Sequence, residues 1–282
     1  MPDAAQKVAL VTGANQGLGL ALVRGLRRTL GEESVVYLAA RDADRGEAAC
    51  SLLQREGLTP DFIQLDITDA ASVAAAAGKI RARHGGIDIV IQNAAARITR
   101  DTPQADQVAG FVDTNNHGTL RVIEAFVPLL RDHARFIVVA SSFGSLRNLD
   151  PRLHGKFDAP GLTLRDIERA MDEFVSLTRA GMARQEGWPD WINVPSKIGQ
   201  VAAVRVLARE KADEFRRRGI LVNAACPGLI DTEASRPWFE DMSKAATPDE
   251  GARDLVWLAT LPAGTQEPYG ILVRHRKPHP WT

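Results

Sequence analysis

Short apolar runs alternate with longer amphipathic runs along this chain, and no other feature of the sequence limits the fold as strongly. Apolar runs of about four to eight residues are typical of buried strands, and amphipathic runs of about ten or more are typical of helices. Strand, helix and strand in succession form the unit of parallel sheets, whose two faces are covered by helices. The alternation therefore predicts an α/β protein with a doubly wound parallel sheet.

The expected elements follow from the positions of these runs. About seven strands are expected, over residues 7–12, 34–40, 61–67, 87–93, 135–142, 219–228 and 269–273. Helices are expected over residues 17–30, 44–56, from Asp69 onward, 115–132 and 197–218. No internal repeat or linker rich in proline and glycine divides the sequence, so we predict a single domain over residues 1–282.

Residues 143–195 interrupt the alternation, because polar and amphipathic segments stand where a short connection would suffice. Helical spacing over 163–185 gathers the following apolar side chains on one face: Leu164, Ile167, Met171, Phe174, Val175 and Met182. The pattern predicts a helical insertion that packs on the domain, directly before the helix expected at 197–218.

Charge and composition exclude several kinds of partner. The chain carries 35 basic and 35 acidic residues, so no net field draws it to nucleic acid or to a membrane surface. No apolar run reaches the roughly 20 residues of a membrane span, and the N-terminal residues lack the features of a signal peptide. Cys50 and Cys226 fall in elements expected to be buried, which favours a reducing, cytoplasmic setting. The basic tail RHRKPHPWT predicts a solvated terminus.

The turn TGANQGLG, residues 12–19, directly follows an expected strand and opens an expected helix. Glycines at 13, 17 and 19 remove side chains where a backbone must turn tightly and approach a pyrophosphate, which would lie at the positive N-terminus of the helix. In this context the turn predicts a Rossmann-like dinucleotide site, and a tight turn without a ligand is the alternative.

The end of the second expected strand bears on the choice between NAD and NADP. An acidic residue there would bind a ribose 2′-hydroxyl and repel a 2′-phosphate. The strand instead ends near Arg41, and Arg45 follows one helical turn later; guanidinium groups suit a phosphate. Asp42 suits a helix cap, so NADP is favoured. Asp66, after the third strand, is expected either to accept a hydrogen bond from the adenine amino group or to cap the next helix.

The spacing TGxxxGxG resembles the short-chain dehydrogenase/reductase family, and further motifs extend the likeness along essentially the whole chain. QNAA (92–95), DTNNHGT (113–119), VVASS (138–142) and CPGLIDT (226–232) resemble the family's segments around the cofactor and the reacting carbon, in the same order. The resemblance implies NADP as cofactor, bound by Gly13, Asn15, Gln16, Gly17, Leu18, Gly19, Arg41, Arg45, Asp66, Ile67, Asn93, Ala94, Lys197, Pro227, Gly228, Ile230 and Thr232.

One branch of the family fits best. ARDADRGEAA (40–49), EGWP (186–189), the long insertion and SKIG (196–199) together resemble the monomeric carbonyl reductases. In that branch the insertion covers the face through which other members form tetramers. The resemblance therefore implies a monomer that acts on a small-molecule substrate, and no metal is expected.

One position departs from the family's pattern. The stretch from EGWP to SKIG aligns without a gap, so Asn193 falls where the family's Tyr-x-x-x-Lys motif has its tyrosine, and Lys197 keeps the lysine. The sequence contains only two tyrosines, Tyr37 and Tyr269, in or near the second and seventh expected strands. Ligands of such sheets bind at the carboxyl ends of the strands, and neither tyrosine is expected to reach that edge.

The family's mechanism implies a role for each remaining group. Hydride passes from the nicotinamide to a carbonyl carbon while tyrosine protonates the oxygen. The serine (here Ser142) binds the substrate oxygen, the lysine (Lys197) lowers the pKa of the phenol and binds the ribose, and the asparagine (Asn115) holds a relay water. The Asn193 amide donates hydrogen bonds but releases no proton at physiological pH, and loss of a general acid costs about 10²- to 10⁴-fold in rate. A bound water, Lys197 itself, or a substrate that needs little protonation could replace the acid.

Two further expectations concern side chains around the pocket. Trp188 and Trp191 are expected at its mouth and suit a bulky apolar substrate, although packing of the insertion explains them equally well. His117 stands two residues after Asn115, and on a helix that step points about 160° away. We therefore expect His117 to lie outside the pocket.

Three functions are compatible with the sequence. The first is an NADPH-dependent reductase of a ketone, aldehyde or quinone, with an atypical proton donor in place of tyrosine. The second is a scaffold redirected to isomerisation, cyclisation or elimination, which the missing tyrosine favours. The third is an NADPH-binding regulatory protein; the retained Ser142, Asn115 and Lys197 argue against it, because a sensor would need only the cofactor end.

Overall fold

Eight strands form one sheet in the computed structural model, which describes residues 6–282. Their order across the sheet is β3-β2-β1-β4-β5-β6-β7-β8, and all neighbours run parallel except β7 and β8. The strands are β1 (Val8–Val11), β2 (Val35–Ala40), β3 (Asp61–Gln64), β4 (Ile87–Gln92), β5 (Leu130–Val139), β6 (Leu221–Cys226), β7 (Leu272–Arg274) and β8 (Lys277–Pro278). The doubly wound α/β class and the seven expected strands are confirmed.

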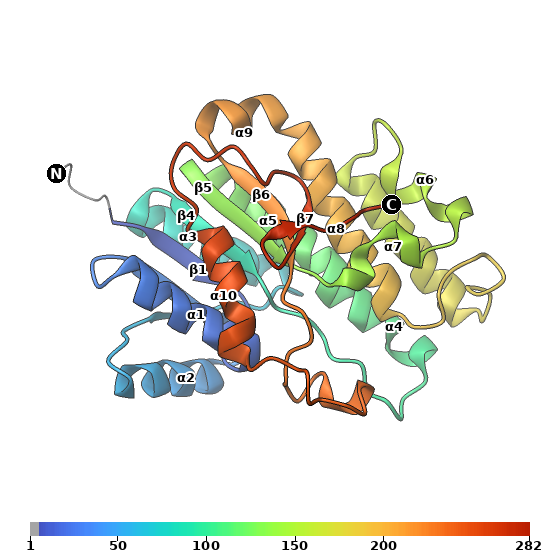
Figure 1. Ribbon diagram of the computed structural model, residues 1–282, viewed down its shortest axis with the longest axis horizontal. Helices are drawn as coiled ribbons and strands as arrows, with labels where there is room; N and C mark the ends of the chain where they lie inside the picture. Colours follow the sequence, from blue (N-terminus) through green and yellow to red (C-terminus); the bar gives the residue numbers. More distant parts are fainter. Residues whose placement is uncertain (1–5) are drawn as a thin grey trace.

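Helices cover both faces of this sheet (Figure 1). One face packs against α1 (Gly17–Leu30), α2 (Ala43–Arg55) and α10 (Pro248–Ala259). The other packs against α3 (Ala70–His84), α4 (Gln104–Val112), α5 (Gly118–Phe126), α8 (Asn193–Glu210) and α9 (Ala212–Arg218). Because the sheet is covered on both faces, its central strands are apolar almost throughout instead of alternating. Every residue of β1, β2, β4 and β6 is buried.

Two helices differ from the sequence-based expectation. The segment 115–132 is not one helix: α4 already begins at Gln104, a π-helical turn η1 (Asp113–His117) joins it to α5, and the residues from Leu130 belong to β5. The segment 197–218 begins earlier, at Asn193, and divides at Lys211 into α8 and α9. Helix α10 was not predicted from the sequence, although Thr247 and Glu250 form a reciprocal capping box at its start.

The insertion is helical, as expected, and leads into α8. Three short 3₁₀ helices, η3 (Ser142–Gly144), η4 (Leu146–Asn148) and η5 (Pro151–Leu153), precede α6 (Gly155–Asp158) and the longer α7 (Leu164–Arg179). Helix α7 packs against α4 and α8 and buries Ile167, Met171 and Phe174. It ends at Arg179, so Met182 lies beyond it and is 44% exposed; its predicted place on the apolar face was wrong.

The C-terminal tail is not a solvated terminus. It forms β8, and Trp281 is only 9% exposed. The backbone oxygen of Trp281 accepts hydrogen bonds from Ser145 Oγ (2.9 Å) and from the Leu146 amide (2.7 Å). The Arg205 guanidinium lies over the indole, 4.9 Å from its centroid. The tail therefore holds the beginning of the insertion in place. Burial of Trp281 keeps the tail on the protein although most of its other residues are polar or basic.

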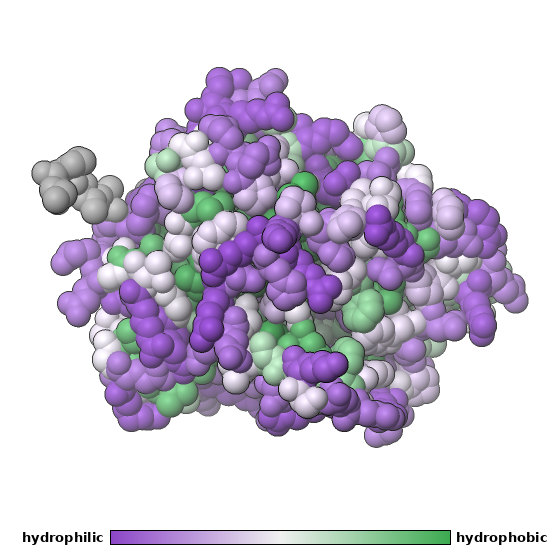
Figure 2. Space-filling model, in the orientation of Figure 1, coloured by the Kyte–Doolittle hydropathy of each residue, from purple (hydrophilic) through white to green (hydrophobic). Residues whose placement is uncertain are grey.

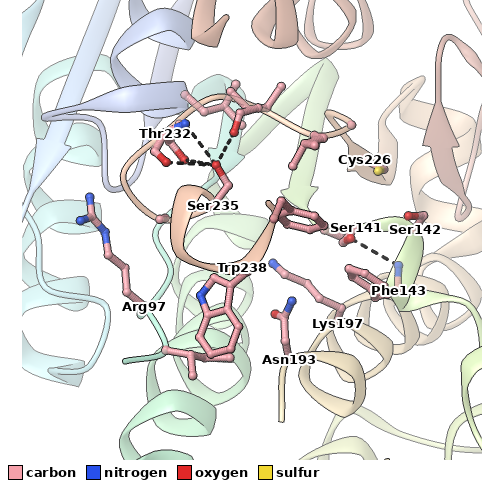
Figure 3. A pocket seen from close by; sticks show the side chains of 18 of the residues that line it. Arg97, Ser141, Ser142, Phe143, Asn193, Lys197, Cys226, Thr232, Ser235 and Trp238 are labelled. Carbon is pink, nitrogen blue, oxygen red and sulfur yellow. Dashed lines mark hydrogen bonds between the residues drawn. The ribbon is translucent and has the colours of Figure 1, made fainter. Parts of the chain in front are cut away.

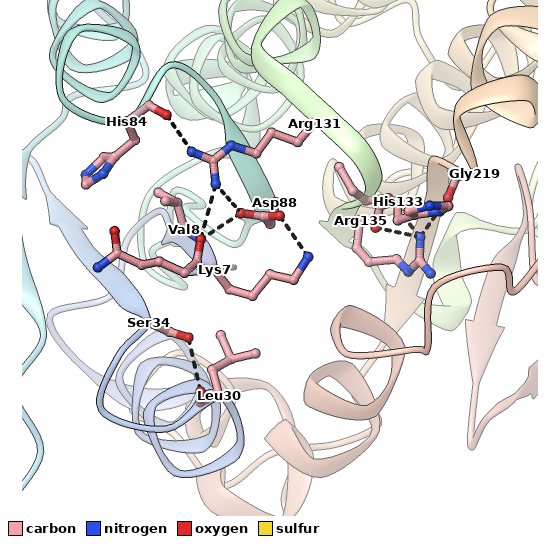
Figure 4. Close-up of polar contacts among 12 residues, drawn as sticks. Lys7, Val8, Leu30, Ser34, His84, Asp88, Arg131, His133, Arg135 and Gly219 are labelled. Carbon is pink, nitrogen blue, oxygen red and sulfur yellow. Dashed lines mark hydrogen bonds and ion pairs between the residues drawn. The ribbon is translucent and has the colours of Figure 1, made fainter. Parts of the chain in front are cut away.

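Polar ties hold the amino-terminal edge of the sheet (Figure 4). The buried Asp88 of β4 accepts hydrogen bonds from Lys7 Nζ, the Val8 amide and Arg131 Nη1, each at 2.9 Å. The buried Arg135 of β5 donates to backbone oxygens, among them that of Gly219 at 2.9 Å. Both buried charges have protein partners, as buried charges generally require, and both lie at the edge away from the carboxyl ends of the strands.

The surface is mostly hydrophilic, and hydrophobic residues gather at the lower centre of the view in Figure 2, above the segment that follows β6. No helix within residues 6–282 combines the length and the apolar character that crossing a lipid bilayer requires.

Candidate active site

A cavity of about 400 Å³ opens at the carboxyl ends of β4, β5 and β6. This is the edge where doubly wound sheets bind their ligands. The wall comes from segments far apart in the sequence: Ala96, Arg97 and Ile98 after β4; Ala140, Ser141, Ser142 and Phe143 after β5; Asn193 and Lys197 on α8; and Gly228, Ile230, Thr232, Ser235 and Trp238 after β6.

Ser142, Asn193 and Lys197 all line this cavity (Figure 3). Asn193 is the first residue of α8, and Lys197 follows one helical turn later, so their side chains share a face of the helix. Ser142 begins the turn after β5, where Ser141 Oγ accepts a hydrogen bond from the Phe143 amide at 3.3 Å. Three of the four predicted catalytic residues therefore face one space.

The amino group of Lys197 is partly buried at the cavity wall. It donates to the backbone oxygen of Val139 at 3.2 Å and to Gln200 Oε1 at 2.8 Å. Burial lowers the pKa of Lys197 to about 8, against a smaller opposing effect of Cys226. No aspartate, glutamate, histidine or tyrosine occurs among the cavity-lining residues of the described chain. Lys197 therefore has no carboxylate partner in the cavity.

Asn115 lies behind Lys197 and does not line the cavity. It is buried in the π-helical turn η1, and its Oδ1 accepts a hydrogen bond from the Ala96 amide at 2.8 Å. Its backbone oxygen accepts from Gln200 Nε2 at 3.0 Å and from Thr119 Oγ1 at 2.6 Å. Asn115 therefore fixes the loop after β4 and is linked to Lys197 through Gln200, which the sequence reasoning missed. A glutamine in the otherwise apolar run of α8 was the available signal.

The side chains expected to lie outside the cavity do so. Tyr37 Oη lies 2.9 Å from His84 Nε2, and Tyr269 Oη donates to the backbone oxygen of Ala208 at 2.6 Å. His117 faces away from the cavity, with its Nε2 3.2 Å from an Asp172 carboxylate oxygen.

The two tryptophans before α8 have different positions. Trp191 lines the cavity, with ring centroids 5.1 Å from Phe143 and 5.7 Å from Trp238. Trp188 is 2% exposed and packs on Phe174 at 4.9 Å within the insertion. The expected place at the pocket mouth is therefore right for Trp191. It is wrong for Trp188, whose indole is buried in the core of the insertion.

The glycine-rich turn between β1 and α1 is packed as a close-approach turn. Gly13 has φ +61°, and a Cβ there would lie 2.7 Å from the Ala94 Cα; a Cβ on Gly19 would lie 2.4 Å from the Gly13 oxygen. Asn93 Nδ2 donates to the backbone oxygens of Thr12 (3.0 Å) and Gly13 (3.1 Å). No side chain caps the first turn of α1 at Gln16. The turn thus leaves the helix's N-terminal amides for an anionic ligand, as a dinucleotide site requires.

Arg41 directly follows β2 and Arg45 lies in the first turn of α2, and both are exposed. Asp42 caps α2, as expected, by accepting a hydrogen bond from the Arg45 amide at 3.0 Å, and its other oxygen lies 3.8 Å from Arg45 Nε. Asp66 does not cap α3: its Oδ1 accepts from the Thr68 amide at 2.9 Å, and the cap is Asp69. The helix-cap alternative for Asp66 was therefore wrong.

The remaining predicted cofactor residues occupy the same edge of the sheet. Ser235 Oγ accepts a hydrogen bond from the Thr232 amide at 3.1 Å and so shapes the segment after β6 (Figure 3). A Cβ on Gly17 would lie 3.6 Å from Thr232 Cγ2, so this segment approaches the glycine turn. At the carboxyl ends of the strands lie Asn15, Gln16, Leu18 and Gly19 after β1, Ile67 after β3, Asn93 and Ala94 after β4, and Pro227, Gly228, Ile230 and Thr232 after β6.

The fold, the glycine turn and this cavity are those of a short-chain dehydrogenase, and comparison with known sequences agrees. Residues 7–150 match the family described as short chain dehydrogenase. The chain belongs to this family.

Curated relatives resemble the chain over its length. It is 37% identical to carbonyl reductase (NADPH) 1 of Mus musculus over 283 residues, covering 99% of this chain and 100% of that protein. It is 37% identical to the Homo sapiens protein of that name, covering 97% and 98%. It is 38% identical to carbonyl reductase (NADPH) 3 of Mus musculus, covering 98% of each.

Solved structures share the architecture. Salutaridine reductase from Papaver somniferum superposes with a TM-score of 0.79 at 25% identity, over 95% of this chain and 99% of that one. Menthone neomenthol reductase from Mentha piperita gives 0.79 at 25% identity, over 97% and 100%.

Proposed function

We propose that this protein is an NADPH-dependent oxidoreductase that reduces the carbonyl group of a ketone, aldehyde or quinone, with a proton donor other than tyrosine. The observation that carries the proposal is that Ser142, Asn193 and Lys197 line one cavity beside the glycine-rich turn. Relatives named carbonyl reductase (NADPH), 37% identical over the length of the chain, support the same activity.

NADPH is the proposed cofactor, and residues 1–282 are proposed to form its single binding domain. The amides at the start of α1 suit the pyrophosphate, and Arg41 suits the 2′-phosphate because its exposed guanidinium lies where NAD-binding proteins place an acid. Asp66 suits the adenine, and Lys197 with the segment Pro227–Thr232 suits the nicotinamide end. Bound NADPH would supply a hydride at the cavity.

Lys197 is the proposed general acid. Asn193 is proposed to occupy the family's tyrosine position, where its amide, like the Ser142 hydroxyl, donates a hydrogen bond to the substrate oxygen. The cavity wall offers no histidine or carboxyl group within the described chain, and the pKa of Lys197 is about 8. That value suits a proton donor near neutral pH. As the carbonyl carbon gains hydride, the oxygen takes a proton from the Lys197 ammonium, which becomes a neutral amine and regains a proton from solvent.

The substrate is proposed to be bulky and apolar at the end away from its carbonyl. Phe143, Trp191 and Trp238 form an aromatic wall beside the reacting groups. Apolar walls with a few convergent polar groups are typical of small-molecule sites.

The protein is proposed to act as a monomer in the cytoplasm. Helix α7 packs against α4 and α8, and the resemblance implied that such an insertion covers the face through which other members form tetramers. Both cysteines are free and buried, as in a reducing compartment.

A second candidate is non-redox chemistry on the same scaffold, such as isomerisation or elimination. It is favoured by the absence of a tyrosine from the cavity wall within residues 6–282. A purely regulatory NADPH-binding protein would not need the three converging polar side chains.

Turnover separates these functions. NADPH oxidation is measured against a panel of quinones, aldehydes and ketones for the unmodified protein, Asn193→Tyr and Lys197→Met. We expect measurable reduction that rises about 10²-fold or more in Asn193→Tyr and falls by a similar factor in Lys197→Met. If none of the three variants oxidises NADPH although all bind it, the reductase proposal fails and the redirected scaffold takes its place.

A further inference from the structure

Gln200 contacts the Lys197 amino group from the protein interior, which we call its inner side, opposite the cavity. It is 1% exposed and lies one helical turn beyond Lys197 on α8. Its Oε1 accepts the hydrogen bond from Lys197 Nζ at 2.8 Å, and its Nε2 donates to the Asn115 backbone oxygen at 3.0 Å and to Thr119 Oγ1 at 3.2 Å. An ammonium group only donates and a backbone oxygen only accepts. The amide oxygen of Gln200 must therefore face Lys197.

This arrangement closes the inner side to proton transfer. The Asn115 backbone oxygen accepts from Thr119 Oγ1 at 2.6 Å as well as from Gln200, so both of its lone pairs are engaged. The family resemblance implied a relay water on that asparagine, and the Gln200 carboxamide fills the link between Asn115 and Lys197. A carboxamide donates and accepts hydrogen bonds but exchanges no proton at neutral pH.

We infer that Gln200 is a positioning residue, which holds the Lys197 ammonium by its inner side, keeps it charged and turns its remaining N–H toward the substrate. The inference rests on the proposed function. With the inner path closed, the amine left after each transfer regains its proton from the cavity mouth, once product has departed.

Few other charges act on Lys197. Cys226 on β6, Arg274 on β7 and Arg97 after β4 line the same cavity, and Ser141 and Ser142 after β5 bring no charge. None of these groups supplies a negative charge comparable to a carboxylate. The hydrogen bond that Gln200 Oε1 accepts from Lys197 Nζ at 2.8 Å therefore supports the charged form, beside the longer contact with the Val139 oxygen at 3.2 Å.

Two substitutions of Gln200 should move the protonation of Lys197 in opposite directions. Gln200→Glu keeps the length and places a carboxylate at the amino group, which should raise the pKa of Lys197 by about one to three units. Gln200→Leu removes the acceptor and adds apolar surface, which should lower the pKa. General damage to the fold would not produce opposite shifts. Val204→Ala, one turn further along the buried side of α8, is the matched control and should leave the pKa unchanged.

The pKa is read directly, without cofactor or substrate. Protein labelled with ¹³C at the lysine ε carbon is titrated by NMR, and the Lys197 signal is identified by its loss in Lys197→Met. In parallel, kcat/KM for carbonyl reduction is measured against pH. We expect the pH at which kcat/KM falls to be higher in Gln200→Glu and lower in Gln200→Leu. The two shifts should match those of the NMR midpoints.

The results separate the inference from the proposed function. Equal midpoints of Lys197 in all variants would overturn the role of Gln200, whatever the activity. If the NMR midpoints of Lys197 shift but the fall of kcat/KM at high pH stays in place, Lys197 is not the proton donor. Shifted midpoints in a protein that reduces no carbonyl with NADPH would sink the proposed function and leave the hold of Gln200 on Lys197 established.

Discussion

At the scale of single residues, Lys197 carries a charge that the protein only partly compensates. Its acceptors are one backbone oxygen and one amide oxygen, and burial lowers its pKa from 10.5 to about 8. A lowered pKa means that the folded state binds the proton less tightly than the unfolded chain does. The charged lysine is therefore a cost to stability at neutral pH.

This cost predicts a pH dependence of stability. Between pH 8 and 10.5 the unfolded chain holds the Lys197 proton and the folded protein has released it, so the unfolding free energy should rise with pH in that window. Relative to Lys197→Met, the gain should reach up to about 3 kcal/mol, and below pH 8 the difference between the two proteins should stay constant. Urea unfolding at several pH values measures it. A difference that is flat from pH 7 to 10.5 would show that the folded-state pKa is ordinary.

Arg41 and Arg45 allow a matched test of cofactor choice. Arg45 already has a carboxylate neighbour in Asp42, 3.8 Å away, whereas Arg41 follows β2 directly. Arg41→Ala should weaken NADPH binding about 10- to 100-fold, the value of a charge-assisted contact, and change NADH binding little. Arg45→Ala should have a smaller effect. Calorimetric titration of both nucleotides measures this, and an equal loss for NADPH and NADH in Arg41→Ala would rule out a 2′-phosphate contact.

At the scale of elements, the sequence predicted best what is encoded locally. The parallel strands appear because their buried apolar runs are continuous, and the turn at 12–19 keeps its glycines for steric reasons that the motif itself contains. The π-helical turn at Asp113–His117 could not be predicted in this way. Its Asn115 backbone oxygen is shared between Thr119 and the distant Gln200, so the turn is supported by a contact made only in the folded chain.

The C-terminal tail shows the opposite error, in which composition hid a structural element. Its basic residues suggested a solvated end, but the Trp281 backbone oxygen binds it to the insertion and the Trp281 indole packs under Arg205 of α8. Trp281→Ala should lower the unfolding free energy by about 3 kcal/mol, because it removes a buried indole. The exposed Lys277→Ala in the same tail should be nearly neutral. Urea unfolding of both variants checks this, and equal effects would mean that the tail is not anchored through Trp281.

At the scale of the whole molecule, the cavity was the feature that could be predicted least well from the sequence. Its wall joins Arg97, Phe143, Asn193 and Trp238, which belong to segments that meet only because strands β4, β5 and β6 are neighbours. Family motifs located the proposed reacting groups, since each motif is contiguous. The aromatic wall and the Gln200 link depend on packing between distant segments, and no local pattern encodes that packing.

The insertion also bears on assembly. Because α7 lies against α4 and α8, those helices are covered by the chain itself, and we expect a single species near 30.6 kDa in solution. Sedimentation velocity at several protein concentrations measures this. A stable tetramer over that range would contradict the monomer and would mean that another face associates.

The polar ties around Asp88 and Arg135 have a consequence for how such a protein can change over generations. They lie at one edge of the sheet and involve none of the residues around the cavity. Mutations that reshape the loops over the opposite edge leave these ties intact, so the substrate can change without loss of the fold. Mutations of Asp88 or Arg135 would destabilise the fold, and selection should remove them. The two edges of one sheet are thereby free to evolve at different rates.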